Sequence, residues 1–181
     1  MTLSLEAFIV SPEKLKIWEL SPHILSGTGH RPHKTNNEYD LKGPYSTFLR
    51  KKIQVCFELL QPRKIISGMA LGFDQLLALE ALERNIKVIA AIPCDGQESK
   101  WPQKSKDRYY SILSNSLVTE HHVSPGPYHV SKMQVRNIWM CNNSDAVIAA
   151  WDGSGGGTEN CLSYASFKNM LIYRINPSEA V

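Results

Sequence analysis

A run of glycine and hydroxyl residues is the strongest chemical signal in the sequence. It consists of Gly153, Ser154, Gly155, Gly156, Gly157 and Thr158, and it lies directly after an apolar segment and before a helical pattern. Glycine lets the main chain approach an anion closely, and the free amides at the start of a helix attract phosphate. A turn from strand to helix ordinarily needs few residues and one glycine. We therefore favour a phosphate-binding loop over the alternative, a flexible surface turn.

A second glycine turn has the sequence SGMALGFD and ends at Asp74. Ser67, Gly68 and Met69 follow an apolar run and are further candidates for ligand contacts. The turn has neither the GK[ST] of a Walker loop nor the GxGxxG of a dinucleotide fingerprint, so ATP hydrolysis and ordinary NAD-dependent redox chemistry lose support. Two roles stay open for Asp74, a cap or first-turn acid of the next helix and a contact to the ligand.

The sequence GTGHRP near the start places a third glycine turn beside an arginine. Gly27, Thr28, His30 and Arg31 are candidates for phosphate or ribose contacts, because arginine donates two parallel hydrogen bonds to an oxyanion. No second histidine lies at a zinc-ligand spacing from His30, so we expect it to form hydrogen bonds. The four cysteines are widely spaced and form no CxxC pair. We therefore expect no metal site and no resident cofactor.

Candidate partners of these turns lie later in the chain. Arg136 and Asn137 fall in a helical pattern among apolar residues, which leaves little room for an ordinary solvated face. Trp151 and Asp152 end the apolar run before the glycine-rich loop, and they offer a stacking face and a carboxylate. Asp152 is the acid best placed to accept a ribose hydroxyl or to assist at an anomeric carbon.

The elements that position these residues are predicted from six short apolar runs. These are residues 23–29, 64–68, 87–93, 116–122, 145–151 and 170–175. The runs are nearly continuous, which is typical of strands covered by helices on both faces, and helical patterns lie between them. The alternation predicts an α/β fold, a single domain with a doubly wound, mostly parallel sheet flanked by helices. Ligands bind such sheets beyond the carboxyl ends of the strands, where the three glycine turns should meet.

Length and composition fit one folded domain. The chain has 181 residues, of which 43% are hydrophobic. We assign residues 21–181 to the nucleotide-binding domain and residues 1–20 to an N-terminal appendage or helix. No apolar run is long enough to cross a membrane, and Glu6, Glu13 and Glu19 argue against a signal peptide. We expect a soluble, cytoplasmic protein without a membrane partner.

The charge balance argues against a nucleic-acid partner. Twenty basic and 17 acidic residues leave a formal net charge of +3. Trp101, Tyr109 and Tyr110 alternate with basic residues, but Glu98 and Asp107 dilute this patch. Because nucleic-acid-binding proteins carry clustered basic charge, DNA binding is the least favoured partner hypothesis.

Four blocks of sequence, in this order, resemble the SLOG superfamily, and its YpsA-type branch most closely. They are SGTGHRP, SGMALGFDQLLALEAL, AAIPCDGQ and RNIWMCNNSDAVIAAWDGSGGGTENCLSYA. The superfamily includes the DNA-processing protein DprA, the LONELY GUY phosphoribohydrolases and sensor domains that bind nucleotide-derived signals. The resemblance implies a Rossmann-like fold and, because LONELY GUY proteins assemble, a homo-oligomer that is a dimer or larger.

The phosphoribohydrolases of this superfamily cleave the N-glycosidic bond of nucleoside monophosphates. They use an arginine on the helix before a PGGxGTxxE loop and the glutamate of that loop. The resemblance carries the arginine to Arg136 and the loop to residues 155–158, but Cys161 takes the place of the glutamate. Glu159 is offset by two positions, and a helix turns by about 100° per residue, so its carboxylate points elsewhere. If the chain is an enzyme, Arg136, Asp152 and Glu159 are the catalytic candidates.

Our first hypothesis is a module that binds a nucleotide or a nucleotide-derived small molecule, such as a signalling nucleotide. Phosphate would contact residues 155–158 together with Ser67 and Gly68, with Arg31 and Arg136 as charge partners, and Glu159 completes the predicted ligand-binding set. A hydrolase or transferase acting on the N-glycosidic bond is the alternative, and DprA-like DNA binding is the third hypothesis. All three require the glycine turns to share one cavity.

Overall fold

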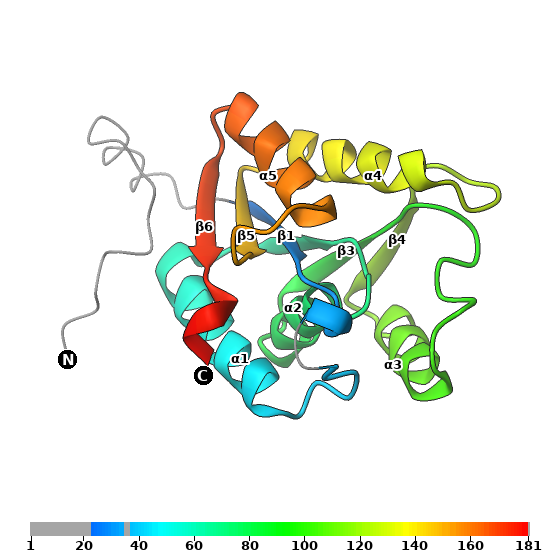
Figure 1. Ribbon diagram of the computed structural model, residues 1–181, viewed down its shortest axis with the longest axis horizontal. Helices are drawn as coiled ribbons and strands as arrows, with labels where there is room; N and C mark the ends of the chain where they lie inside the picture. Colours follow the sequence, from blue (N-terminus) through cyan, green and yellow to red (C-terminus); the bar gives the residue numbers. More distant parts are fainter. Residues whose placement is uncertain (1–22, 35–36, 181) are drawn as a thin grey trace.

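The computed structural model describes residues 23–34 and 37–180, which form one parallel sheet between two layers of helices (Figure 1). The six strands of this part of the chain lie in the order β4-β3-β2-β1-β5-β6, and every neighbouring pair is parallel. They are β1 (Ile24–Gly29), β2 (Lys64–Ser67), β3 (Lys87–Ile92), β4 (Val118–His122), β5 (Ala146–Ala150) and β6 (Leu171–Ile175). This confirms the predicted Rossmann-like α/β fold. The appendage predicted for residues 1–20 lies outside the described residues.

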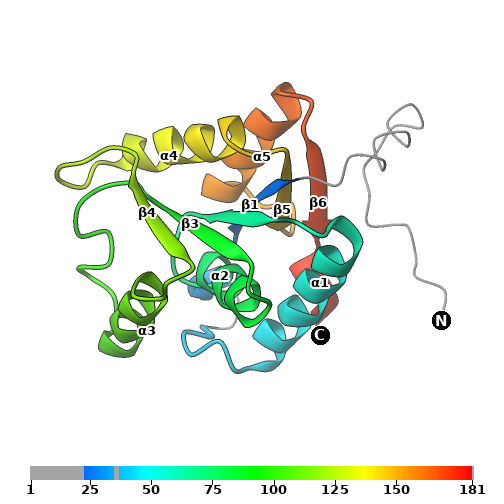
Figure 2. The same cartoon turned by 180° about the vertical axis from the view of Figure 1, so that it is seen from behind.

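Helices cover both faces of the sheet. They are α1 (Pro44–Leu60), α2 (Phe73–Glu83), α3 (Gln103–Leu113), α4 (Val130–Asn142) and α5 (Gly157–Phe167), with the short 3-10 helices η3 (Pro32–Lys34) and η4 (Pro177–Ala180). The first three α-helices lie on one face, and α4 and α5 lie together on the other (Figures 1 and 2). None of the helices in the described residues is long and apolar enough to cross a membrane.

The inner strands of the sheet are apolar on both sides because each face is packed against helices, whereas the edge strand β4 is polar and mostly exposed. Every residue of β5 is buried, since this strand lies between β1 and β6 and beneath helices on both faces. The larger core cluster joins Leu25 and Ile65 to α1 and α2, and a smaller cluster packs Val147 against Leu162 of α5. Each large apolar side chain buried in this way stabilises the fold by about 1.5–3 kcal/mol.

The order of the strands fixes where a ligand can bind. After β1 the chain adds β2, β3 and β4 on one side, and it then crosses back to add β5 and β6 on the other. The strands β1 and β5 are therefore neighbours, and Gly29 is paired with Ala150 at their carboxyl ends. The chain thus leaves the sheet in opposite directions after these two strands, which opens a crevice between the connections.

Candidate functional site

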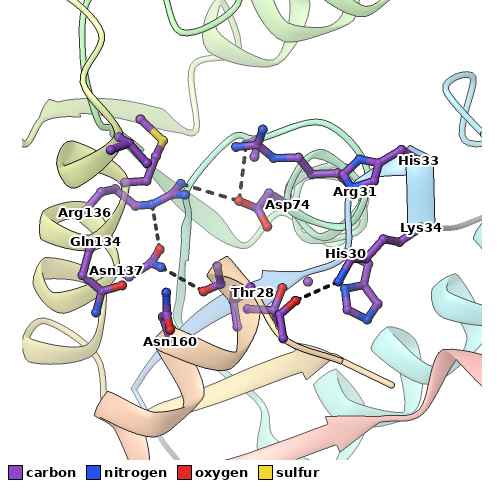
Figure 3. Close-up of a pocket in the computed structure, with 18 of the residues that line it drawn as sticks. Thr28, His30, Arg31, His33, Lys34, Asp74, Gln134, Arg136, Asn137 and Asn160 are labelled. Atoms are coloured by element: carbon purple, nitrogen blue, oxygen red, sulfur yellow. Dashed lines mark hydrogen bonds and ion pairs between the residues drawn. The ribbon is translucent and has the colours of Figure 1, made fainter. Parts of the chain in front are cut away.

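A cavity of about 420 Å³ opens at this crevice, beyond the carboxyl ends of β1 and β5 (Figure 3). Four segments line it, within residues 28–34, 70–74, 128–137 and 155–160. Three of them contain the glycine turns singled out in the sequence, and the other includes the first two turns of α4. All three turns therefore contribute residues to one cavity, the second turn through Ala70 and Asp74 and not through the predicted Ser67 and Gly68.

The glycine-rich loop forms the floor of the cavity at the start of α5. Gly155, Gly156, Gly157 and Thr158 line the cavity. Gly156 precedes the first residue of α5 and has a φ of 136°, which favours glycine, and no side chain caps this helix end. The amides of the first turn have no partner within the helix itself, so they are free to bind an anion.

Lys34, on the opposite side of the cavity, forms hydrogen bonds with this loop. Its ammonium donates hydrogen bonds to Ser154 Oγ at 2.8 Å and to the Gly155 carbonyl at 2.9 Å. Arg31 and His33 are exposed and line the same rim, and Arg31 points toward Asp74 (Figure 3). The segment after β1 therefore supplies positive charge to the cavity.

A buried ion pair joins the second glycine turn to α4. Nη1 of Arg136 lies 3.6 Å from Oδ2 of Asp74, and both residues are at least nine-tenths buried. The Arg136 Nε donates a hydrogen bond to Asn137 Oδ1 at 3.1 Å, and Asn137 Nδ2 donates to the Gly157 carbonyl at 3.2 Å. One chain of contacts therefore links α2, α4 and α5 around the cavity.

Arg136 also carries a donor that is not satisfied. Its Nη1 is buried and forms no hydrogen bond with any of the described residues. Burial lowers the pKa of the guanidinium, but arginine starts so high that it stays charged. Burial likewise raises the pKa of Asp74, although Arg136 and the Ala70 amide favour its ionised form. Arg136 Nη1 is therefore held by its ion pair with Asp74 and by packing against Gly68, without a hydrogen bond.

Ser67, Gly68 and Met69 support this site from behind and do not line the cavity. Ser67 Oγ donates to the Asp74 carbonyl at 2.8 Å and accepts from the Met69 amide at 3.1 Å. Gly68 lies against the guanidinium, since a Cβ placed there would be 1.4 Å from Arg136 Nη1. The second turn therefore reaches the cavity through Ala70 and Asp74.

His30 lines the cavity, whereas the tip of β5 turns away from it. His30 Nε2 lies 2.8 Å from Asp152 Oδ1, which also accepts a hydrogen bond from the Ser154 amide at 2.8 Å. Partial burial acts to raise the pKa of Asp152, but the contacts with Ser154 and His30 outweigh it and hold that pKa below its ordinary value. Trp151 donates from its indole to the Ser154 carbonyl at 2.8 Å and stacks beneath the Arg174 guanidinium. Asp152 and Trp151 therefore stabilise the glycine-rich loop through Ser154, without lining the cavity.

The placement of the carboxylates bears on any hydrolytic chemistry. Neither Asp152 nor Glu159 is among the described residues that line the cavity, and Asp74 is the one carboxylate among them. Gly153 and Ser154 also lie outside the lining, and Gly27 packs against Leu77 of α2. Within residues 23–34 and 37–180, no group of three histidine, cysteine or acidic side chains is arranged to hold a metal.

Several lining residues were not identified in the sequence. They are Gly29, His33, Lys34, Ala70, Tyr128, Val130, Met133, Gln134 and Asn160. The sequence HRPHK could have indicated two of them, since His33 and Lys34 lie within three positions of Arg31. No sequence pattern indicated Tyr128 or Gln134, because their position depends on how the connection after β4 folds back to the cavity.

The fold and the cavity together define a Rossmann-like α/β protein with a crevice at the point where the strand order reverses, lined by basic side chains and by a glycine-rich loop. Residues 12–179 match the family described as DNA recombination-mediator protein A, and the chain belongs to that family. This confirms the resemblance to the SLOG superfamily. The chain is 31% identical to the SPbeta prophage-derived protein YoqJ of Bacillus subtilis (strain 168), over 76% of this chain and 92% of that protein.

Two solved structures of DNA processing protein A are similar in fold. The protein from Streptococcus pneumoniae superposes with a TM-score of 0.63 at 20% identity, covering 90% of this chain and 52% of that one. A structure from Helicobacter pylori, described for its single-stranded DNA binding mode, gives a TM-score of 0.58 at 17% identity, covering 97% and 79%. This chain therefore spans about half the length of the Streptococcus pneumoniae protein.

Proposed function

We propose that this protein binds the phosphate of a nucleotide, or of a nucleotide-derived small molecule, in the cavity beyond β1 and β5. The observation that carries the proposal is the buried guanidinium of Arg136, whose Nη1 has no hydrogen-bond acceptor among the described residues and which lines the same cavity as the start of α5. The Arg136 charge is paired with Asp74 at 3.6 Å, but a buried donor without a hydrogen bond is still unfavourable, by about 1–3 kcal/mol for a neutral group. A phosphate within reach of this guanidinium would reduce that cost.

The surroundings support an anionic group. The first-turn amides of α5 and the Thr158 side chain face the cavity from one side, and Arg31 and Lys34 lie at its rim. Glycine at positions 155–157 leaves the main chain open to close approach, and a Cβ on Gly157 would meet nothing within 4 Å. Charge and backbone geometry therefore favour the same ligand chemistry.

Calorimetric titration and thermal unfolding test this proposal. AMP, ADP-ribose and a cyclic dinucleotide form the panel, and a true ligand at about 100 times its Kd stabilises the fold by roughly 2.7 kcal/mol. Arg31→Gln and Lys34→Gln should weaken binding. Arg63→Gln is the matched control, because Arg63 is exposed and precedes β2 at the opposite edge of the sheet.

Absence of stabilisation by every compound of the panel contradicts the proposal, and so does equal weakening by Arg63→Gln. Chromatography of the same mixtures reports whether free base is released. Such release is the outcome that the alternative, cleavage of the N-glycosidic bond, requires.

Single-stranded DNA is the second candidate ligand. The Helicobacter pylori relative is described for binding it, and Arg31, His33 and Lys34 place exposed basic groups side by side at the cavity mouth. The low net charge of the chain is therefore a weaker argument against nucleic acid than the sequence suggested, because the local charge matters more. Fluorescence anisotropy of a labelled oligonucleotide at about 50 and about 200 mM salt tests this, since phosphate contacts make binding strongly salt-dependent.

Self-association is a separate proposal. It is supported by the resemblance to LONELY GUY proteins, which assemble as dimers or larger species. Light scattering on the eluting protein measures the mass directly, and a monomer at all concentrations contradicts it.

A further inference from the structure

We infer that the α4 side of the cavity is a subsite for a nucleobase, so that the ligand is a complete mononucleotide and not a sugar phosphate alone. The inference rests on the phosphate binding proposed above and concerns the other end of the same site. It assigns to Tyr128 the role of a stacking platform for the base.

The two sides of the cavity differ in chemistry. His33 and Lys34 lie on one side, and Gln134 and Asn160 lie on the other (Figure 3). The α4 side also contains Arg136, which we assign to the phosphate, and, toward the start of the helix, Tyr128, Val130 and Met133, which are apolar or aromatic. A ligand that fills both sides therefore carries an anionic group at one end and a planar, uncharged, polar-edged group at the other, which is the composition of a nucleotide.

Two large side chains on the α4 side of the cavity are exposed to solvent. Tyr128 is 66% exposed and Val130 is 68% exposed, although both line the cavity. Large apolar side chains exposed together beside a pocket are typical of a ligand-binding surface. Tyrosine presents a flat aromatic face, and every nucleobase stacks on such a face.

Hydrogen bonds hold the segment before Tyr128 in place. Lys132 Nζ donates to the carbonyls of Ser124 and Pro125 at 2.9 and 2.8 Å. The Gly126 amide donates to Asp95 Oδ2 at 2.9 Å, and the Asp95 amide donates to the Gly126 carbonyl at 3.0 Å. This segment is therefore attached both to α4 and to the connection after β3.

The residue after Tyr128 is fixed as well. His129 precedes α4 and accepts a hydrogen bond from the Ser131 amide through its ring nitrogen, which caps the helix. Tyr128 thus lies between two anchored positions, and little of its backbone freedom is lost when a ligand binds. Such preorganisation increases affinity.

Amide side chains complete the subsite. Gln134 and Asn160 each offer a donor and an acceptor, which match the mixed edge of a base without adding charge. Stacking on one aromatic side chain changes the Kd by roughly fivefold to 150-fold. The base should therefore contribute at least about fivefold to the affinity of the intact nucleotide.

Calorimetry with AMP and with ribose 5-phosphate separates the two ends of the site. The wild-type protein should bind AMP at least about fivefold more tightly than ribose 5-phosphate. Tyr128→Ala should weaken AMP binding by at least about fivefold and leave the binding of ribose 5-phosphate unaffected. Tyr128→Phe, which keeps the ring, should bind AMP like the wild type. Phe167→Ala is the control, because Phe167 is 80% exposed and does not line the cavity.

Equal affinity of the wild type for the two compounds overturns the base subsite while leaving the phosphate site intact. Equal weakening of both compounds by Tyr128→Ala also overturns it, since the substitution then acts on the fold of the site and not on the base. Binding of neither compound overturns the subsite together with the proposed function.

Discussion

Substituting alanine for Gly68 tests whether the pair of Arg136 and Asp74 depends on the space that this glycine leaves. A Cβ at Gly68 would lie 1.4 Å from Arg136 Nη1 and 2.8 Å from Asp74 Oδ2. The guanidinium would have to withdraw by about 2 Å to reach an ordinary contact distance. Gly68 is not among the residues with positive φ, so the added methyl group strains this contact and not the backbone.

The expected loss of stability follows from two effects. Overpacking of a buried site costs about 1–3 kcal/mol, and separation of a buried ion pair costs about 3–5 kcal/mol. Separating the pair relieves part of the overpacking, so the two costs are not summed, and the lower bound for the ion pair, about 3 kcal/mol, is the predicted decrease in the free energy of unfolding for Gly68→Ala. In a chain of this length such a change lowers the Tm by roughly 6–12 °C.

Urea unfolding followed by circular dichroism measures this loss. The matched control is Gly157→Ala, because a Cβ on Gly157 would meet nothing within 4 Å. The control should be as stable as the wild type or slightly more so, since alanine is favoured over glycine in a helix. If Gly68→Ala unfolds at the same urea concentration as Gly157→Ala, the reasoning about the packed guanidinium is refuted.

Three further predictions concern other parts of the fold. Glu80→Gln should destabilise the protein by about 3 kcal/mol, because the buried Glu80 carboxylate pairs with Arg50 and accepts two further hydrogen bonds. Glu83 lies on the exposed face of the same helix, so the control Glu83→Gln should barely shift the urea midpoint. Asp152→Asn should lower stability at pH 7. The pKa of Asp152 is held below its unfolded value of about 3.9, so its stabilisation is present above that pH and is lost as the pH falls toward the folded pKa; urea midpoints of variant and wild type should therefore converge below about pH 4, and a constant difference would contradict this. All four cysteines are free and buried, so a thiol reagent should label them only in denaturant, and rapid labelling of the native protein would count against this packing.

The strands were predictable because burial on both faces leaves a continuous apolar run. The run at residues 145–151 contains β5, whose five residues are all buried. The run at residues 116–122 was less well defined, since β4 begins only at Val118. The Leu117 amide donates to the Asn115 side chain at 2.9 Å, and this local turn delays entry into the strand. Hydrogen bonds of this kind leave no trace in an apolar pattern.

The meeting of the glycine turns was predictable, but the direction of each side chain was not. Parallel strands place their carboxyl ends at one edge, so the three turns had to converge there. Asp152 forms an ion pair with His30 at 2.8 Å and does not line the cavity, although it directly precedes the glycine-rich loop. The direction of a side chain at such a turn depends on backbone angles, which the residue types do not specify.

Lys34 shows another limit of the sequence. It lies in the short helix η3, which has no apolar periodicity to place it. Its contact with Ser154 joins residues 120 positions apart, so only the pairing of β1 with β5 brings them together. Contacts that depend on the complete topology cannot be inferred from a local pattern.

The pairing of β1 with β5 also has a consequence for synthesis of the protein. The first wall of the cavity leaves the ribosome early, but it acquires its opposite wall only after residues 155–160 have emerged. A nascent chain that stops before this point has no complete pocket, so a ligand in the cell cannot assist its early collapse. A ligand that needs residues 155–160 therefore cannot bind a chain that stops before them, so binding of such a ligand distinguishes these shorter products from longer chains.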